Sequence, residues 1–265
     1  MKRSFDNIRR SLSNFSQVRQ HVHYDGELLH KPGCDKAEPL PREFELLLWN
    51  VFKGGCGAAF EQDICSYAET ADLLCLQEVL FENGPQLPSA LDDFAYDYSP
   101  SYSRQDAAHE GVMTLSRYAL HPVGERLRSV GSEPWVSTPK SAVISSVPLA
   151  GGGELTLLNI HMLLVRSQQS ARRELHSALE RLTAVAGEAQ PTLFVGDLNT
   201  LLPRQLTLVD DELRHHGFRR IEPAADPRRL RLDHIYCRDI RSAELRIDAN
   251  LASSDHPALI CDVRI

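Results

Sequence analysis

The chain has no long hydrophobic run. Its longest apolar segments are short, as at 46–49 and 142–144, whereas a membrane-spanning helix needs roughly 20 consecutive apolar residues. The first 20 residues also lack the apolar core of roughly 7 to 15 residues that a secretory signal contains. We therefore expect no integral membrane segment and a cytoplasmic location.

Closely paired cysteines and a nucleotide-binding loop are missing as well. The chain has six cysteines: Cys34, Cys56, Cys65, Cys75, Cys237 and Cys261. They include no CxxC pair, which argues against a cysteine-based zinc site and favours free thiols in a reducing compartment. The glycine-rich segment 54–57 is not followed by Lys and then Ser or Thr, so it does not form a P-loop.

Positive charge is in short supply. The sequence has 29 Lys and Arg against 36 Asp and Glu, a formal net charge of −7. This balance argues against a protein that coats nucleic acid by charge alone, but it is compatible with an enzyme that acts on phosphates. Hydrophobic residues make up 42% of the 265 residues, which is enough for a substantial core.

We expect two parts in the chain. Residues 1–43 are polar and histidine-rich, and they end in the turn-forming Pro-Leu-Pro segment at 39–41. Within them, Asn7–Val18 has the spacing of a short helix. His21 and His23 have no carboxylate nearby at ligand spacing, so we interpret residues 1–43 as a solvated or docked arm and not as a metal site. Residues 44–265 have no linker that divides them, which predicts one domain.

This body alternates short apolar strands with a few helices. Helical periodicity is present over 60–68, 172–185 and 206–213, with Gly217 as a stop signal for the last helix. Three consecutive glycines at 151–153 indicate a hairpin turn. The expected strands are Phe44–Trp49, Leu73–Gln77, Val112–Ser116, Ser141–Val147, Leu155–Ile160, Thr192–Val195, Leu232–Cys237, Ala243–Ile247 and Ala258–Val263.

Polar side chains stand at the ends of many of these strands. The blocks are Asn50, Gln77-Glu78, Asn159-Ile160-His161, Gly196-Asp197-Leu198-Asn199, Leu232-Asp233-His234 and Ser254-Asp255-His256. Carboxylates gathered at the edge of a core repel one another and lose hydration unless a cation compensates. Because carboxylate and amide oxygens are the ligands that Mg²⁺ prefers, the pattern favours a divalent metal site.

In this order, the six blocks resemble the endonuclease/exonuclease/phosphatase superfamily, which includes DNase I, abasic-site endonucleases, neutral sphingomyelinases and inositol phosphate 5-phosphatases. The resemblance spans about residues 44–265, and the blocks at 196–199 and 254–256 are its most specific parts. Segments 49–53, 111–117 and 140–142 look most like a bacterial branch of undefined substrate. The resemblance implies an α/β fold, a DNase I-like sandwich of two mixed β-sheets flanked by helices, with 44–265 as the catalytic domain.

The resemblance also implies roles around a metal ion and the attacking water. Glu78 would be the main Mg²⁺ ligand, with Asn50 and Asp255 beside it and Mn²⁺ as a substitute metal. Asp197 would orient and deprotonate the water, and Asn199 would steady the phosphoryl oxygens. A metal and an amide aimed at the developing negative charge lower the barrier to phosphodiester hydrolysis.

Two histidines complete the implied site. His256 would contact the scissile phosphate, with Asp233 fixing its ring. His161 matches a histidine of the DNase I and sphingomyelinase branches that assists the leaving group or braces the phosphate, where abasic-site endonucleases carry a tyrosine. Asn159 would hold the loop from behind the site.

Other residues leave alternatives open. Lys53, Arg117, Lys140 and Arg231 are candidate contacts to substrate phosphate, and each is equally well explained as a solvated surface cation. Phe52 stands where abasic-site endonucleases carry a further carboxylate, which disfavours a second metal-binding mode, although one metal or two stays open.

We therefore expect a Mg²⁺-dependent hydrolase that acts on a phosphodiester, with nucleic acid among the candidate substrates. The alternative is a lipid or small phosphorylated substrate, as in sphingomyelinases and inositol phosphatases; a lipid would require an exposed apolar loop, which we would seek at Leu80–Leu91 or Met162–Val165. A catalytically silent binding module is a further alternative, but the retention of all the polar blocks argues against it.

Overall fold

The computed structural model of the chain describes residues 27–33, 38–55, 57–103, 108–124, 126–133, 137–164, 167–187 and 189–265. The helical elements are η1 (Phe52–Gly54), α2 (Ala58–Thr70), η2 (Ser89–Leu91), α3 (Gln168–Val185) and α4 (Pro203–His215). The strands are β1 (Leu29–Lys31), β2 (Glu43–Asn50), β3 (Leu73–Phe81), β4 (Ala95–Ser103), β5 (His109–Ser116), β6 (His121–Pro122), β7 (Leu127–Arg128), β8 (Ser141–Pro148), β9 (Glu154–His161), β10 (Thr192–Asp197), β11 (Arg219–Arg220), β12 (Asp233–Arg238), β13 (Ser242–Asp248) and β14 (Ala258–Arg264).

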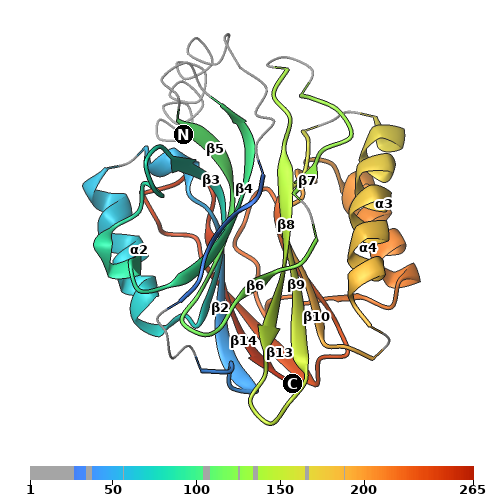
Figure 1. Cartoon of the computed structure of the whole chain (residues 1–265). Helices are drawn as coiled ribbons and strands as arrows, with labels where there is room; N and C mark the ends of the chain where they lie inside the picture. Colours follow the sequence, from blue (N-terminus) through green and yellow to red (C-terminus); the bar gives the residue numbers. More distant parts are fainter. Residues whose placement is uncertain are drawn as a thin grey trace.

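These strands form two mixed sheets that pack face to face (Figure 1). The first has the order β1-β4-β5-β3-β2-β14-β13, and the second has the order β11-β12-β10-β9-β8-β6, with β7 also paired to β8. Each sheet contains one parallel pair, β2 with β3 and β9 with β10, among antiparallel neighbours. The two mixed sheets with flanking helices confirm the expected fold class.

Three apolar clusters hold the layers together. The first lies between the sheets and includes Leu48, Leu157 and Val195. The second joins the outer face of the second sheet to α3 and α4, and the third joins the outer face of the first sheet to α2. In α2 the buried residues are Phe60, Ile64 and Ala68, so one apolar face of the helix covers the sheet as its periodicity predicts.

The nine expected strands and three expected helices are confirmed, as is the hairpin turn at 151–153 between β8 and β9. The sequence did not indicate β4, which carries Ser, Tyr, Asp and Pro in place of an apolar run. Its polar side chains are buried with partners: Asp97 is fully buried and accepts a hydrogen bond from Ser145 of β8. Strand composition alone does not reveal such an element, because its stability comes from tertiary pairing.

Part of the expected arm packs on the body. β1 extends the first sheet by pairing with β4, and His30 on β1 lies 2.8 Å from Asp97 through its Nδ1 atom. Leu40 is fully buried and belongs to the core between the sheets. The expected helix Asn7–Val18, His21 and His23 lie outside the described residues.

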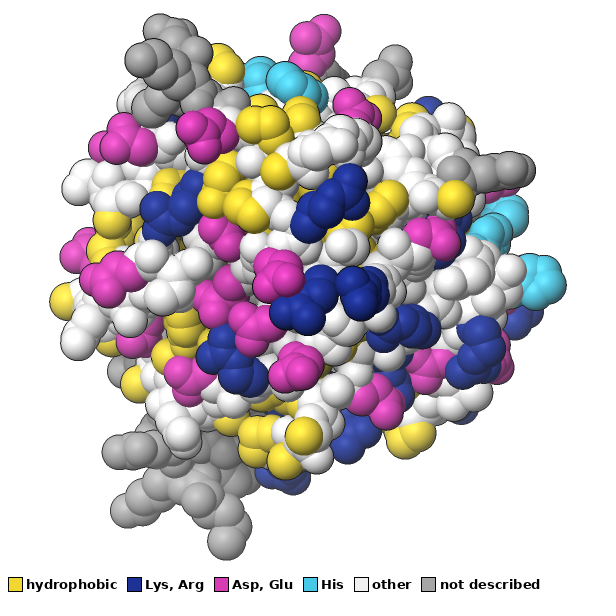
Figure 2. All heavy atoms as spheres, turned by 90° about the horizontal axis from the view of Figure 1, so that it is seen from below, with side chains coloured by type: hydrophobic (Ala, Val, Ile, Leu, Met, Phe, Trp, Pro, Cys, Tyr) yellow, Lys and Arg dark blue, Asp and Glu magenta, His cyan; other side chains and the backbone are white. Residues whose placement is uncertain are grey.

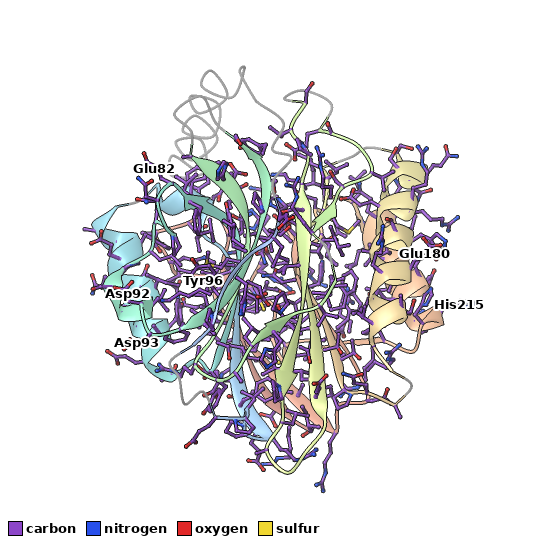
Figure 3. The ribbon with its side chains drawn as sticks, viewed as in Figure 1. Glu82, Asp92, Asp93, Tyr96, Glu180 and His215 are labelled. Atoms are coloured by element: carbon purple, nitrogen blue, oxygen red, sulfur yellow. The ribbon has the colours of Figure 1, made fainter. Side chains whose placement is uncertain are left out.

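The lower face of the molecule in Figure 1 carries charges of both signs. Figure 2 shows this face, where acidic and basic side chains alternate. Ion pairs from β2 to β14 and β13, such as Arg264 with Glu43 at 2.9 Å and Arg246 with Glu45 at 2.8 Å, belong to this end of the first sheet. On the outer side of the second sheet, Glu180 of α3 and His215 of α4 point away from the strands (Figure 3). Within the described ranges, no helix is both long and apolar enough to cross a lipid bilayer.

Candidate active site

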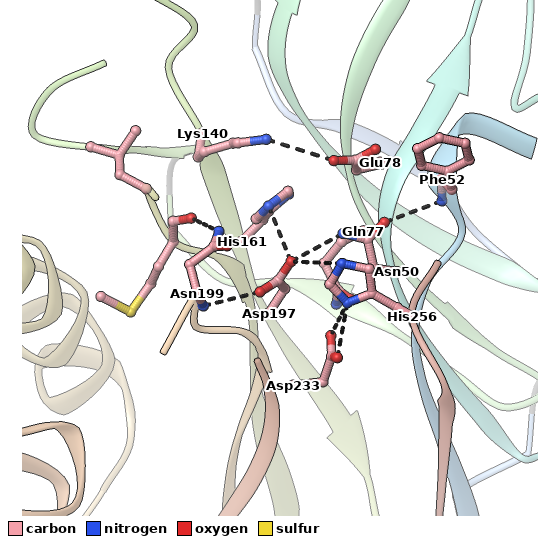
Figure 4. Close-up of polar contacts among 12 residues, drawn as sticks. Asn50, Phe52, Gln77, Glu78, Lys140, His161, Asp197, Asn199, Asp233 and His256 are labelled. Carbon is pink, nitrogen blue, oxygen red and sulfur yellow. Dashed lines mark hydrogen bonds and ion pairs between the residues drawn. The ribbon is translucent and has the colours of Figure 1, made fainter. Parts of the chain in front are cut away.

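The strand topology brings the polar blocks to one edge of the sandwich. β2 and β3 run parallel, so Asn50 and Glu78 emerge at the same end of the first sheet. In the second sheet β9 and β10 run parallel and place His161 opposite Asp197, while antiparallel β12 places Asp233 on the other side of Asp197. The edge where these ends meet is therefore where carboxylates, amides and imidazoles converge (Figure 4).

The end of β10 is fixed by close backbone packing. A Cβ atom on Gly196 would lie 1.8 Å from the backbone oxygen of Ile160 on β9, so only glycine allows the strands to approach here. Beyond Asp197, Asn199 has a φ of 50°, a left-handed conformation that asparagine tolerates better than most residues. Its backbone N–H donates to Asp197 Oδ1 at 3.0 Å, and its Nδ2 donates to the backbone oxygen of Met162 at 2.7 Å.

Asp197 lies at the centre of the site. The carboxylate is almost fully buried, with 1% of the residue exposed. Its Oδ2 atom accepts a hydrogen bond from Asn50 Nδ2 at 3.1 Å and lies 3.4 Å from His161 Nε2 and 3.8 Å from His256 Nε2. An oriented carboxylate between two imidazoles and two amides is the arrangement expected for a general base.

His256 and Asp233 form a partly buried ion pair. His256 Nδ1 lies 2.9 Å from Asp233 Oδ2 and 3.1 Å from Oδ1, and the backbone of the histidine is held by the Ser254 hydroxyl and by Trp49 Nε1. Burial alone would lower the pKa of His256, but the carboxylates of Asp233 and Asp197 outweigh it and raise this pKa well above its ordinary value. His256 is therefore an imidazolium at neutral pH.

His161 is in the opposite protonation state. Its side chain is nearly buried, and burial together with the ammonium group of Lys140 lowers its pKa to about 3. The ring is thus neutral at neutral pH and can donate one hydrogen bond. Two histidines that flank one carboxylate, one charged and one neutral, can serve different roles towards a bound phosphate.

Glu78 is turned into the site by an irregularity of β3. Its φ is 59°, and the pairing of β3 with β5 shifts register between Leu76 and Val79. Bulges of this kind redirect a side chain next to functional sites. The carboxylate contacts Lys53 Nζ through Oε2 and lies 3.8 Å from Lys140 Nζ through Oε1. Burial opposes ionisation of Glu78, but the two lysines outweigh it and lower its pKa.

Glu110 and Tyr102 belong to the same network, and the sequence analysis missed both. Glu110 is 2% exposed, lies 3.2 Å from Lys53 Nζ and 3.9 Å from Lys140 Nζ, and accepts a hydrogen bond from the Tyr102 hydroxyl. The only sequence signal was a glutamate that stands next to Gly111, just before the apolar residues of β5. Through these contacts Glu110 positions both lysines beside Glu78.

A buried amide pair ties the two sheets together under the site. Gln77 Nε2 donates to Asn159 Oδ1 at 2.6 Å, and Asn159 Nδ2 donates to the backbone oxygen of Met113 at 2.9 Å. These residues come from β3, β9 and β5. Asn159 thus acts from behind the site, by holding the sheets in register rather than by holding a loop.

The donors around Glu78 fit a divalent cation. Two ammonium groups, Lys53 and Lys140, face the carboxylates of Glu78, Glu110 and Glu133. Burial raises the pKa of Asp255, and the charges of His256, Glu78 and Lys53 also act on it. Around the two ammonium groups the three glutamates leave a surplus of negative charge, which a hard divalent cation would neutralise through oxygen ligands. Lys53 would release Glu78 when such an ion binds.

A second acidic group lies at Asp197. Ligand atoms of Asp197, Asp233 and His256 all lie within 4.8 Å of one another. His256 is positively charged here and binds Asp233 through Nδ1. The Nδ1 atom of His256 is thus occupied by Asp233 and its Nε2 atom faces Asp197 at 3.8 Å, an arrangement suited to contact with a phosphate oxygen.

Of the four candidate substrate contacts, the structure places two in the site, one beside it and one away from it. Lys53 and Lys140 lie in the site, and Arg231 is half-exposed beside it, paired with Asp226 at 3.0 Å. The prediction that Arg117 contacts the substrate is wrong. Arg117 follows the far end of β5, where its Nε atom donates to the backbone oxygen of Ala71 and its guanidinium stacks on Phe94. Because β5 is antiparallel to β3, that end lies away from Glu78.

Comparisons with known proteins agree with this architecture. The model of the Endonuclease/Exonuclease/phosphatase family matches residues 47–256. A UPF0294 protein of Vibrio parahaemolyticus is 26% identical over 223 residues, which cover 82% of this chain and 77% of that protein. Among solved structures, an endonuclease/exonuclease/phosphatase of Bacteroides vulgatus has a TM-score of 0.64 at 13% identity, covering 84% of this chain and 99% of its own. ANGEL2, a 2′,3′-cyclic phosphatase, has a TM-score of 0.64 at 12% identity, with 91% and 99% covered. At these identities the solved structures show the shared fold alone.

Proposed function

The chain belongs to the Endonuclease/Exonuclease/phosphatase family, and from this premise we propose that it hydrolyses a phosphodiester by direct attack of water with the help of a divalent cation, Mg²⁺ or Mn²⁺. The observation that carries the proposal is the position of Asp197. Its buried carboxylate is oriented by Asn50 and by the backbone of Asn199 and lies between a neutral and a charged histidine.

The residues of the site have separate roles in hydrolysis. Asp197 takes a proton from the attacking water at its carboxylate. The His256 imidazolium, held by Asp233, and the Asn199 amide contact the phosphoryl oxygens, where negative charge grows. His161 is neutral at neutral pH, which favours a hydrogen bond to the phosphate over proton donation to the leaving group.

Glu78, Asn50 and Asp255 are the residues that would hold the cation. Such an ion neutralises negative charge on the phosphoryl and leaving oxygens. Lys53 and Lys140 then stay beside the substrate phosphate as additional positive charge, with Glu110 fixing their positions.

The substrate is proposed at the level of its chemistry. A nucleic acid is one candidate, because Lys53 and Lys140 offer positive charge at the site. A diester that carries an apolar group is the second, because Leu201, Leu202 and Leu230 are 42%, 42% and 52% exposed on segments that follow Asn199 and precede Asp233. The apolar loop expected at Met162–Val165 is not exposed in its described part, since Met162 and Leu163 are 1% and 5% exposed.

Cys65, Cys75, Cys237 and Cys261 are free thiols, which supports a reducing, cytoplasmic location.

The test is hydrolysis of bis(p-nitrophenyl) phosphate by wild type and Asp197→Ala, each with EDTA and with added Mg²⁺ or Mn²⁺. We expect turnover only by metal-loaded wild type, with unchanged circular dichroism of the variant. Asp211→Ala is the matched control, because Asp211 is exposed on α4 and, among the described residues, pairs only with Arg214 one turn along the helix. Equal activity of Asp197→Ala and Asp211→Ala would refute the role of Asp197.

A second pair of assays separates the two substrate classes. Leu201→Ser with Leu230→Ser should lower hydrolysis of a long-chain alkyl p-nitrophenyl phosphodiester and leave bis(p-nitrophenyl) phosphate unaffected. An equal effect on both substrates would remove the argument for an apolar diester.

A further inference from the structure

A pocket beside His161 lies outside the site described above. Strands β7, β8 and β9 line one side of it and helix α3 lines the other. The positions of β8 and α3 can be followed in Figure 1. Its volume is about 460 Å³, including the part that is open to solvent. Because one wall is His161 itself, a substrate bound at Asp197 can extend past the histidine ring into this pocket.

The pocket gathers positive charge in a chain of net charge −7. Arg126, Arg128 and Arg181 all line it. Arg128 and Arg181 are exposed at its rim, and Arg126 is half-buried. Among the described residues Arg181 makes no ion pair, whereas Arg172, earlier on the same helix, pairs with Glu212 at 2.7 Å. Arg181 is therefore available to an anionic ligand.

A second, independent feature is the buried carboxyl group of Glu174. This residue is 4% exposed, and its Oε1 atom accepts a hydrogen bond from the backbone N–H of Leu163 at 3.1 Å. Its Oε2 atom is buried and has no hydrogen-bond partner among the described residues. Native proteins rarely leave such an atom unsatisfied, which points to a ligand group that completes its hydrogen bonding.

We propose that this pocket binds a second phosphate group of the substrate, next to the phosphodiester that is hydrolysed. The proposal rests on the phosphoesterase function proposed above and narrows its substrate class. The guanidinium groups of Arg126, Arg128 and Arg181 match phosphate in charge and geometry. Burial raises the pKa of Glu174 to about 8, so at neutral pH its carboxyl group is protonated and donates a hydrogen bond to the same phosphate.

Another arginine-lined pocket lies next to Asp233. Its arginines are neutralised within the chain: Arg228 and Arg231 pair with Asp226 at 2.9 and 3.0 Å, and Arg220 pairs with Asp210 at 3.4 Å. Ion pairs inside a pocket must be broken or shared before an anion binds. Arg181 has no such ion pair among the described residues, which favours the pocket beside His161 as the phosphate site.

The kinetic test compares two aryl diesters that differ by one phosphate. These are thymidine 5′-(p-nitrophenyl phosphate) and the same compound with a 3′-phosphate. For Arg181→Ala we expect KM to rise about tenfold for the bisphosphorylated substrate, the loss expected for one charge-assisted contact, and to stay unchanged for the other. Arg173→Ala is the matched control, because Arg173 is exposed on the same helix but does not line the pocket. Equal KM changes for both substrates would overturn the proposal.

A binding measurement keeps this test independent of turnover. Calorimetric titration with thymidine 3′,5′-bisphosphate should show tighter binding to wild type and Arg173→Ala than to Arg181→Ala. If wild type hydrolyses neither diester but this difference appears, the phosphoesterase function fails and the phosphate pocket stands. If wild type binds the bisphosphate no more tightly than thymidine 5′-monophosphate, the pocket is refuted.

One further binding experiment distinguishes a polynucleotide backbone from a small bisphosphorylated molecule as the source of the second phosphate. A larger effect of Arg181→Ala on binding of trithymidylate than on binding of thymidine 3′,5′-bisphosphate would place the second phosphate in a polynucleotide backbone. An equal effect on both would show that a small bisphosphorylated molecule is sufficient.

Discussion

Replacing Glu174 by glutamine should stabilise the protein, and the gain should grow as the pH rises. In the folded chain the Glu174 carboxyl group is buried on α3, and burial raises its pKa from an ordinary 4.5 to about 8. Glutamine has nearly the same shape and keeps an oxygen that accepts the Leu163 N–H. It removes only the group that must ionise.

The magnitude follows from the difference between the folded and unfolded pKa values. Between about pH 4.5 and 8 the folded chain keeps a proton on Glu174 that the unfolded chain has lost, so the free energy of unfolding of wild type falls with rising pH. At about 1.36 kcal/mol per pKa unit the full difference is on the order of 5 kcal/mol. Since 1 kcal/mol moves Tm by about 2–4 °C in a protein of this size, half of that difference already changes Tm by about 5–10 °C.

The assay is thermal unfolding of wild type and Glu174→Gln at pH 5, 7 and 9. The difference in Tm should be small at pH 5, large at pH 7 and level above pH 8. Glu180→Gln is the matched control on the same helix, because Glu180 points into solvent (Figure 3) and, within the described part of the chain, its carboxylate pairs only with exposed His176. A Tm difference for Glu174→Gln that is constant from pH 5 to 9 would refute the assignment of a buried, protonated carboxyl group.

Three other changes test the site itself. Glu78→Gln should raise the Mg²⁺ concentration needed for half-maximal activity, measured by metal titration, and an unchanged requirement would contradict its role as a ligand. Asp233→Asn should lower kcat by about 10- to 100-fold, the loss of one hydrogen bond to a charged group. It should also shift the alkaline limb of the pH–rate profile to lower pH, because His256 would lose the charge that raises its pKa. An unshifted limb would exclude the role of Asp233 in keeping His256 protonated. Gly196→Ala should cost about 1–3 kcal/mol or more in urea unfolding, because the new methyl group would overlap a backbone oxygen 1.8 Å away, whereas Gly131→Ala, whose Cβ meets its nearest atom at 3.7 Å, should be neutral.

The sequence by itself determined the main strands and helices. Apolar runs such as Phe44–Trp49 were long enough to specify strands, and the spacing of Phe60, Ile64 and Ala68 specified one face of α2. It also placed polar residues at the ends of buried strands. The parallel pairs β2–β3 and β9–β10, which the structure shows, carry Asn50, Glu78, His161 and Asp197 to one edge. These features depend on local pattern and chain order, which a sequence carries directly.

Only the tertiary structure decided which charges meet. Nothing near Arg117 in the chain shows that antiparallel pairing carries it to the far end of β5, nor that Glu110 at the near end of the same strand holds Lys53 and Lys140. The protonation states of His161 and Glu174 are likewise absent from the sequence. Electrostatic energy depends on distance and on exclusion of water, and both arise only when segments far apart in the chain are packed against each other.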